Sequence, residues 1–230
     1  MTEETYYHDF KNDEFADKYI FNKKTSGYFI EIGACNGIDL SQCYFFEKFR
    51  NWDGIAVEPQ KRFRNDVINN RKQPCFNCIG NEKKVVNFTE SVNYGLSGVT
   101  HIQEAHENFE NYKVEWRNEG YTQYSVNMIT LLDLMEDYGC PEYIDYIGMD
   151  CEGSEYNIID HYFKNNTKYK IKFMCIEVGR NDIVELLLQN NYIEINNPIL
   201  PDWNCTKVVW ERYFIHNSEI PTIDPNLVKT

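Results

Sequence analysis

The sequence has no long hydrophobic run, no excess of positive charge and no repetitive segment. No apolar run approaches the roughly 18 consecutive apolar residues that a membrane-spanning helix needs, and no internal repeat or low-complexity linker divides the chain. Lysine and arginine number 23 against 36 aspartate and glutamate residues, which gives a formal net charge of −13. Because nucleic acids and anionic membranes attract proteins through a positive field, the composition argues against both as partners.

The pattern of an exported protein is also missing. The first residues, MTEETYYHDFKNDEF, are acidic where a signal peptide is basic and then apolar. Several of the eight cysteines lie in apolar runs such as KFMCIEV, which indicates buried thiols rather than disulfides. We therefore expect a cytoplasmic protein. Because 230 residues suffice for one sizeable α/β core, we expect a single domain over residues 1–230, with a helical N-terminal extension over residues 1–26.

Short β-like runs alternate with helical segments, which predicts an α/β fold with a mostly parallel sheet and helices on its faces. The runs YIEI and KVVWERYFIH near the end predict two strands that pair antiparallel at a sheet edge. The preceding strands are expected at residues 28–32, 54–58, 75–79, 144–150 and 171–178.

Two helix starts and one lid are predicted from local patterns. Asp39 with Gln42, and Thr130 with Asp133, have the spacing of a capping box at the start of a helix. An apolar stripe from Ile102 to Trp116 lies in an acidic connection that is longer than a simple crossover needs. We therefore expect a lid over about residues 100–120.

A glycine loop follows the first expected strand, in the stretch GYFIEIGACNGIDLSQC. Its two glycines, Gly33 and Gly37, are followed by Glu58 at the end of the next strand. A glycine loop with an acid roughly 20 residues later is the arrangement that binds the ribose of a nucleotide. The pattern predicts a nucleoside site without distinguishing one nucleotide from another.

The chemistry of the loop narrows the choice of ligand. A dinucleotide site needs GxGxxG so that backbone N–H groups approach the pyrophosphate, and a nearby carboxylate would repel that anion. This chain has GxxxG with Glu31 just before it, which disfavours a nicotinamide-dependent oxidoreductase. The loop favours a cationic ligand without phosphate, as S-adenosylmethionine is.

Together with GLSGV, ITLLDLM and IDYIGMDCEGSEYNIID, the glycine-loop stretch resembles the FkbM family of S-adenosylmethionine-dependent methyltransferases. The D-x-E-G-x-E element after an apolar strand is the most specific of these motifs. The resemblance implies a class I methyltransferase (Rossmann-like) fold, a seven-stranded sheet whose last strand is antiparallel. It also implies O-methylation of a hydroxyl on a sugar or a related molecule.

Residues of the glycine loop are expected at the methionine part of the cofactor. Glu31 and the turn from Gly33 to Gly37 would lie against it, with Asn36 and Ser41 as polar contacts. The alternative for the glycines is a tight turn without a ligand, and for Ser41 a hydroxyl on a helix surface.

Residues after the second and third strands are expected at the nucleoside. Glu58, followed by Pro59, would bind the ribose hydroxyls, and its alternative is an exposed carboxylate at a strand end. Cys78 and Ile79 would flank the adenine through backbone and apolar contact. Their alternative is a plain buried strand end.

The D-x-E-G-x-E element supplies the candidate catalytic groups, Asp150 and Glu152. Methyl transfer needs an aligned acceptor, and a hydroxyl acceptor also loses a proton, so a carboxylate base near the methyl group is useful. Asp150 is also expected to contact the cofactor. Glu155 has the alternative of stabilising a helix N-terminus that Ser154 caps. We assign no metal ligand, although converging carboxylates leave a divalent metal open.

Three readings of the function follow. The first is an O-methyltransferase that acts on a sugar or glycan. The second is a methyltransferase with a small-molecule or protein acceptor. The third is a catalytically silent module that binds a glycan or a protein on the same fold. The sequence does not indicate the oligomeric state.

Overall fold

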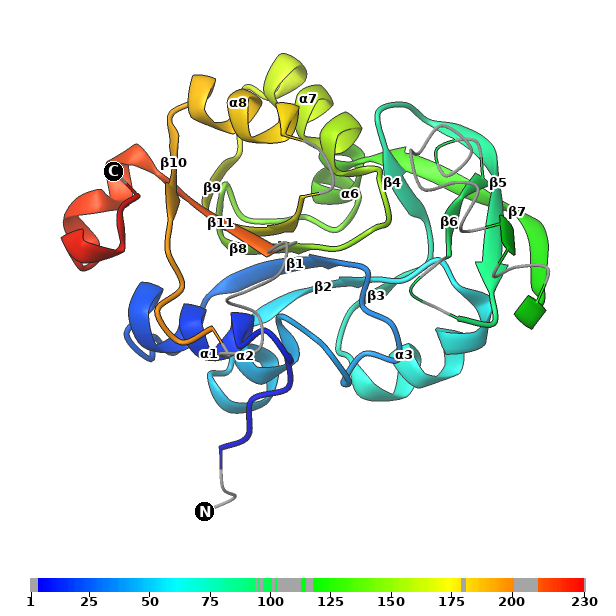
Figure 1. Ribbon diagram of the computed structural model, residues 1–230, viewed down its shortest axis with the longest axis horizontal. Coiled ribbons are helices and arrows are strands. Elements are labelled where there is room, and N and C mark those ends of the chain that lie inside the picture. The colour runs from blue at the N-terminus through cyan, green and yellow to red at the C-terminus, as the bar shows by residue number, and fades with distance from the viewer. Residues whose placement is uncertain are drawn as a thin grey trace.

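The computed structural model describes residues 4–93, 95, 97–100, 102, 113–114, 118–178, 181–200 and 211–229. A seven-stranded sheet in the order β10-β11-β9-β8-β1-β2-β3 is its central layer (Figure 1). β11 is antiparallel to both of its neighbours, and the other neighbours are parallel, as predicted. The strands are β1 (Tyr28–Ile32), β2 (Asp53–Val57), β3 (Pro74–Cys75), β8 (Tyr143–Met149), β9 (Lys170–Glu177), β10 (Tyr192–Ile195) and β11 (Glu211–His216).

Helices cover both faces of this sheet, as expected (Figure 1). One face carries α1 (Asn12–Phe15), the π-helix η1 (Ala16–Ile20), α2 (Tyr44–Phe49), the 3-10 turn η2 (Lys61–Phe63) and α3 (Arg64–Asn70). The opposite face carries α6 (Leu131–Asp137), α7 (Glu155–Asn165) and α8 (Asp182–Gln189). Among the described residues, no helix is both long enough and apolar enough to cross a membrane.

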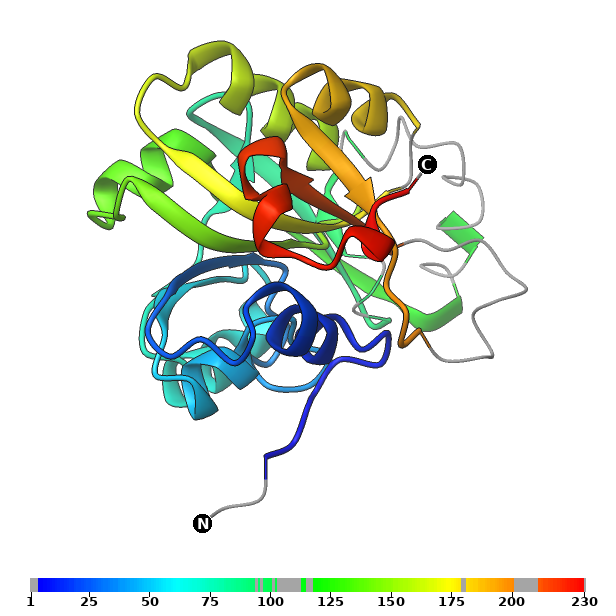
Figure 2. The same ribbon diagram turned by 90° about the vertical axis from the view of Figure 1, so that its left-hand side faces the viewer.

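Two short 3-10 helices, η5 (Asn217–Thr222) and η6 (Pro225–Leu227), follow β11. Figure 2 shows this C-terminal segment next to β10. Val228 forms an antiparallel bridge with Ile195 there. The bridge attaches the tail to the edge of the sheet.

The sheet separates two hydrophobic cores of different character. Successive strand residues point to opposite faces, so Ile147 packs with the aliphatic cluster beneath α6, α7 and α8. Its neighbour Tyr146 packs with an aromatic cluster that includes Phe46, Trp52 and Phe173. All five of these side chains are fully buried. The strands are therefore held from both sides and their ends have defined positions.

A second, four-stranded sheet in the order β4-β7-β5-β6 was not predicted. It consists of β4 (Cys78–Gly80), β5 (Lys84–Ser91), β6 (Gly98–Val99) and β7 (Tyr121–Thr130), and Figure 1 shows it beyond β3. The expected strand 75–79 is wrong because Cys75 pairs with Val57 in the main sheet, whereas Cys78 pairs with Met128 in the second. Most of the predicted lid at 100–120 lies outside the described residues.

One of the two predicted helix starts is wrong and the other is confirmed. Thr130 and Asp133 form the predicted capping box at the start of α6. Asp39 does not begin a helix, because α2 starts at Tyr44 and Leu40 has a left-handed φ of 59°. The backbone amides that precede α2 donate instead to a residue from β1, Glu31, which local spacing does not reveal.

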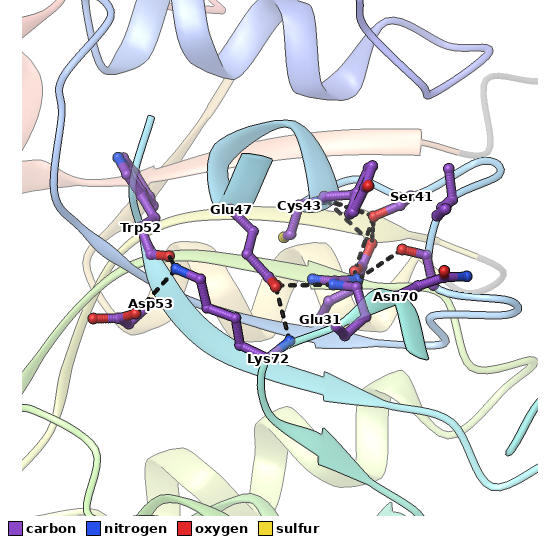
Figure 3. A network of polar contacts seen from close by, with 12 residues as sticks. Glu31, Ser41, Cys43, Glu47, Trp52, Asp53, Asn70 and Lys72 are labelled. Carbon is purple, nitrogen blue, oxygen red and sulfur yellow. Dashed lines mark hydrogen bonds and ion pairs between the residues drawn. The ribbon is translucent and has the colours of Figure 1, made fainter. Parts of the chain in front are cut away.

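Glu31 belongs to a buried ionic network beneath the glycine loop (Figure 3). Its carboxylate accepts hydrogen bonds from the Ser41 hydroxyl at 2.8 Å and from Arg71. The Nε of Arg71 donates to Glu47 at 2.9 Å, and Glu47 also accepts from the backbone of Lys72 at 2.8 Å. The Arg71 side chain is completely buried. One guanidinium therefore compensates two buried carboxylates and joins β1, α2 and the end of α3.

Replacing Arg71 is expected to destabilise the protein strongly. Arg71→Met would leave Glu31 and Glu47 buried without a cation, and breaking a buried pair in this way costs about 3–5 kcal/mol. Urea unfolding measures the loss of free energy of unfolding. Lys164→Met is the control, because Lys164 pairs with Asp160 on the exposed surface of α7 and no measurable change is expected. Equal losses in the two variants would contradict the structural role of Arg71.

Candidate functional site

A cavity of about 350 Å³ lies where β1, β2 and β8 end. This is the edge of an open α/β sheet at which ligands bind. The predicted site residues that line the cavity are Gly33, Glu58, Pro59, Cys78, Ile79, Asp150 and Glu152. The structure thus brings together residues from the ends of four predicted strands.

Four other predicted residues do not line the cavity. Glu31 and Ser41 bond to each other in the network beneath the loop, and Gly37 faces that network because a Cβ atom there would lie 2.9 Å from Arg71. The Asn36 side chain accepts from the backbone of Ile38 and Asp39, which closes a turn within the loop. These four residues thus shape the backbone of the loop and are not part of the cavity lining.

The glycine loop and the D-x-E-G-x-E element touch at Gly33. Gly33 has a φ of 95°, and a Cβ atom at this position would lie 1.8 Å from the carbonyl oxygen of Asp150. The backbone N–H of Asp150 donates to the carbonyl of Ile32 at 2.9 Å. Only glycine combines a positive φ with the absence of a Cβ atom, as this position requires. This contact brings the loop after β1 directly against the carboxylates after β8.

Glu58 lines the cavity and connects two backbone segments. One oxygen accepts from the N–H of Cys35 at 2.8 Å, and the other accepts from the N–H of Gln60 at 2.8 Å. Only 2% of the residue is exposed. Burial, with smaller effects from Glu90 and Asp150, raises the pKa of Glu58 to about 8 despite these two hydrogen bonds. The alternative of an exposed carboxylate is therefore wrong, because Glu58 is a buried group that lines the cavity.

Three carboxylates converge at the end of the cavity that follows β8, where Asp150 and Glu152 line it and Glu177 lies beside them. Asp150, Glu152 and Glu177 each offer an oxygen, and these atoms lie within 4.8 Å of one another. Burial raises the pKa of all three side chains, and for Glu152 and Glu177 the charge of Asp150 adds to this effect. The lining contains no Lys, Arg or His among the described residues. A cationic ligand group would therefore be stabilised at this end, and three oxygens are also suitable ligands for a divalent cation.

Glu155 has a structural position next to this cluster. It is the first residue of α7, and its carboxylate accepts from the backbone of Cys151 at 2.8 Å and of Gly153 at 3.0 Å. Ser154 makes no capping hydrogen bond, so that part of the prediction is wrong. Glu155 shapes the turn that carries Glu152, whose φ of 57° is left-handed. This geometry supports the alternative role considered for Glu155.

The far end of the cavity is formed by the second sheet, which the sequence analysis missed. Phe88 of β5 and Val99 of β6 give it an apolar surface next to Ile79. Gln60 also lines the cavity and was not singled out. The GLSGV motif was the one sequence signal for this part of the cavity, since its residues Ser97, Gly98 and Val99 line it. The motif contributed to the family resemblance, but no role in the site was assigned to it.

The strand order, the antiparallel β11 and a cavity at the ends of β1 and β2 define a class I methyltransferase fold. A family model described as the methyltransferase FkbM domain matches residues 31–197. The chain belongs to the FkbM methyltransferase family. It is a methyltransferase, and this membership implies S-adenosylmethionine as the methyl donor.

Solved structures of methyltransferases are remotely similar to the chain. They include the METTL16 MTase domain (11% identity, TM-score 0.43, 89% of this chain and 66% of that chain). They also include precorrin-6y C5,15-methyltransferase from Geobacter metallireducens GS-15 (12% identity, TM-score 0.39, 89% of this chain and 85% of that chain). A third is human methyltransferase 10 domain containing protein (11% identity, TM-score 0.37, 90% of this chain and 80% of that chain). The chain spans slightly less than two thirds of the METTL16 domain. No curated protein matches the chain.

Substituting Gly33 is expected to disrupt the site. Gly33→Ala introduces a Cβ atom 1.8 Å from backbone and a side chain at a φ of 95°, so the loops after β1 and β8 must separate. Binding of S-adenosylhomocysteine, measured by calorimetry, should fall at least tenfold, which corresponds to about 1.4 kcal/mol. Gly139→Ala is the matched control, since Gly139 also has a positive φ but has open space around it. Unchanged binding in Gly33→Ala would contradict the assigned contact.

Glu58 is expected to make folding stability depend on pH. Its pKa is about 8 in the folded protein and near 4.5 in the unfolded chain, so the folded state holds the proton more tightly. This contribution is fully present below pH 4.5 and is lost as the pH rises towards 8, with a slope of up to about 1.4 kcal/mol per pH unit. The difference in unfolding free energy between wild type and Glu58→Gln should change with that slope. A difference that is constant from pH 5 to 8 would contradict the raised pKa.

Proposed function

We propose that the protein transfers the methyl group of S-adenosylmethionine to a hydroxyl oxygen of a sugar or glycan. The observation that carries the proposal is the polarity of the cavity in an FkbM-family chain. Asp150 and Glu152, with Glu177 beside them, lie at the end that follows β8, the second sheet gives the other end an apolar surface, and Glu58 after β2 lies between them. This order matches a ligand with a cationic amino acid part, a ribose and an adenine.

The residues present fit this donor. The carboxylates Asp150 and Glu152 would stabilise the positive charges of its sulfonium and ammonium groups. Glu58 would accept hydrogen bonds from the ribose hydroxyls, and the surface formed by Ile79, Phe88 and Val99 would pack against the adenine. When bound, S-adenosylmethionine supplies a methyl group that its sulfonium already activates.

The protein's own contribution is to align the acceptor and to take up a proton. A carboxylate whose pKa is raised is a better base towards a hydroxyl than an exposed one. Asp150 and Glu152 meet this condition and border the same cavity. We propose one of them as the base, with the proton moving from the acceptor hydroxyl to a carboxylate oxygen.

Purified protein incubated with S-adenosylmethionine and a panel of nucleotide sugars and free glycans is expected to yield a methyl ether, detected by mass spectrometry. Asp150→Asn and Glu152→Gln should reduce turnover by about 10²–10⁴-fold if the residue is the base. Glu142→Gln is the control, because Glu142 is exposed and precedes the opposite end of β8. Methylation of a small molecule or protein instead of any sugar would overturn the acceptor assignment, and no methylation of any acceptor class would favour a silent binding module.

The pH dependence of binding distinguishes S-adenosylmethionine bound by carboxylates from S-adenosylmethionine bound by neutral groups. S-adenosylhomocysteine lacks the sulfonium charge, so the affinity ratio of S-adenosylmethionine to S-adenosylhomocysteine should increase as the pH rises and the carboxylates ionise. Calorimetry from pH 6 to 9 measures this ratio. A ratio that does not change with pH would contradict contact between the sulfonium and the cluster. Repeating the methylation assay with a chelator tests a divalent metal at the same carboxylates.

A further inference from the structure

The carboxamide oxygen of Gln60 is a buried polar atom without a hydrogen-bond partner in the described part of the chain. Gln60 lines the cavity next to Glu58, and only 6% of the residue is exposed. Its Oε1 atom is buried and has no hydrogen-bond partner in the described part of the chain. An acceptor in this condition costs about 1–3 kcal/mol, and most buried side-chain amides do have partners. The described part of the fold thus holds a buried acceptor here without satisfying it.

The backbone that carries this amide is held from two sides. The N–H of Gln60 donates to Glu58 at 2.8 Å. The next N–H, of Lys61, donates to Glu90 at 2.9 Å and to the Tyr124 hydroxyl at 3.0 Å, both in the second sheet. Glu90 also accepts from the Nε of Arg62 at 2.9 Å. The position of Gln60 is therefore fixed before any ligand binds, as a specific contact requires.

The position of Gln60 along the cavity indicates which part of a ligand it meets. The main sheet has the order β8-β1-β2, with Asp150 after β8 and Glu58 after β2. Gln60 lies beyond Glu58, where the chain bonds to the second sheet that supplies Phe88 and Val99. If the charged end of the donor is at the carboxylates and its ribose is at Glu58, the base lies beside Gln60.

We propose that the carboxamide of Gln60 binds the edge of the adenine that carries the 6-amino group, which makes Gln60 a determinant of donor specificity. A carboxamide presents one acceptor and two donor hydrogens, and the adenine edge presents an amino donor next to a ring nitrogen acceptor. The two pair through two hydrogen bonds, and a half turn of the amide exchanges its oxygen and nitrogen. The inference rests on the proposed function, because it requires an adenosyl donor.

The test compares S-adenosylhomocysteine with an analogue that has hydrogen in place of the 6-amino group. Calorimetry should show that the wild type binds the analogue about 5–150-fold more weakly, the range expected when an amide and adenine pair well. Gln60→Met, which keeps the length of the side chain, should bind the two ligands with affinities within about twofold of each other. Gln60→Leu serves as a second variant. Gln189→Leu, on the exposed end of α8, should behave as the wild type does.

Stability separates a ligand-binding amide from a structural one. Because Gln60→Met removes an unpaired buried acceptor, the thermal midpoint of the unliganded protein should stay the same or rise. A lower midpoint together with unchanged discrimination would overturn the inference. If wild type and Gln60→Met both bind S-adenosylhomocysteine and discriminate equally, Gln60 does not contact the amino group, while the proposed function stands. If the wild type binds neither ligand, the proposed function itself fails.

Discussion

The contact between Gly33 and the carbonyl of Asp150 is the constraint on which the site depends. β1 and β8 are parallel neighbours, so the segments after them leave the sheet side by side. The absence of a side chain at Gly33 lets these segments approach until a Cβ atom would no longer fit. The backbone of the glycine loop and the carboxylates of the D-x-E-G-x-E element therefore border one cavity although more than a hundred residues separate them.

Two groups of acidic residues differ in their surroundings: buried ones beside a guanidinium, and half-buried ones at the cavity. Some are paired with a guanidinium, as Glu31 is with Arg71 and Asp17 with Arg50, and these join separate elements of the fold. Others, such as Asp150 and Glu152, lie at the cavity where the described lining has no cationic side chain, and their pKa values are raised. Because carboxylates this close together repel each other when ionised, a cation bound between them lowers the free energy of the site.

Local sequence patterns identified the strands and helix starts that depend on residues within the same segment. The apolar strands of the main sheet and the Thr130 capping box were found because burial on both faces and a three-residue spacing leave direct marks in the sequence. The start of α2 was not found, because its backbone amides bond to Glu31 from β1. The strand 75–79 was divided for the same reason, since its two ends pair with strands from different sheets.

The amino-acid sequence alone was enough to identify the family and to locate most strands of the main sheet, because each motif and each apolar run consists of residues close together in the chain. The tertiary structure decided which acids serve the cavity. Glu31 and Glu152 follow similar apolar strand residues, yet Arg71, 40 residues further along, turns Glu31 into a structural group. The surroundings of Gln60 were likewise decided by the tertiary structure, because the second sheet holds the backbone next to it. Distant partners set the environment of a side chain, and no local pattern encodes them.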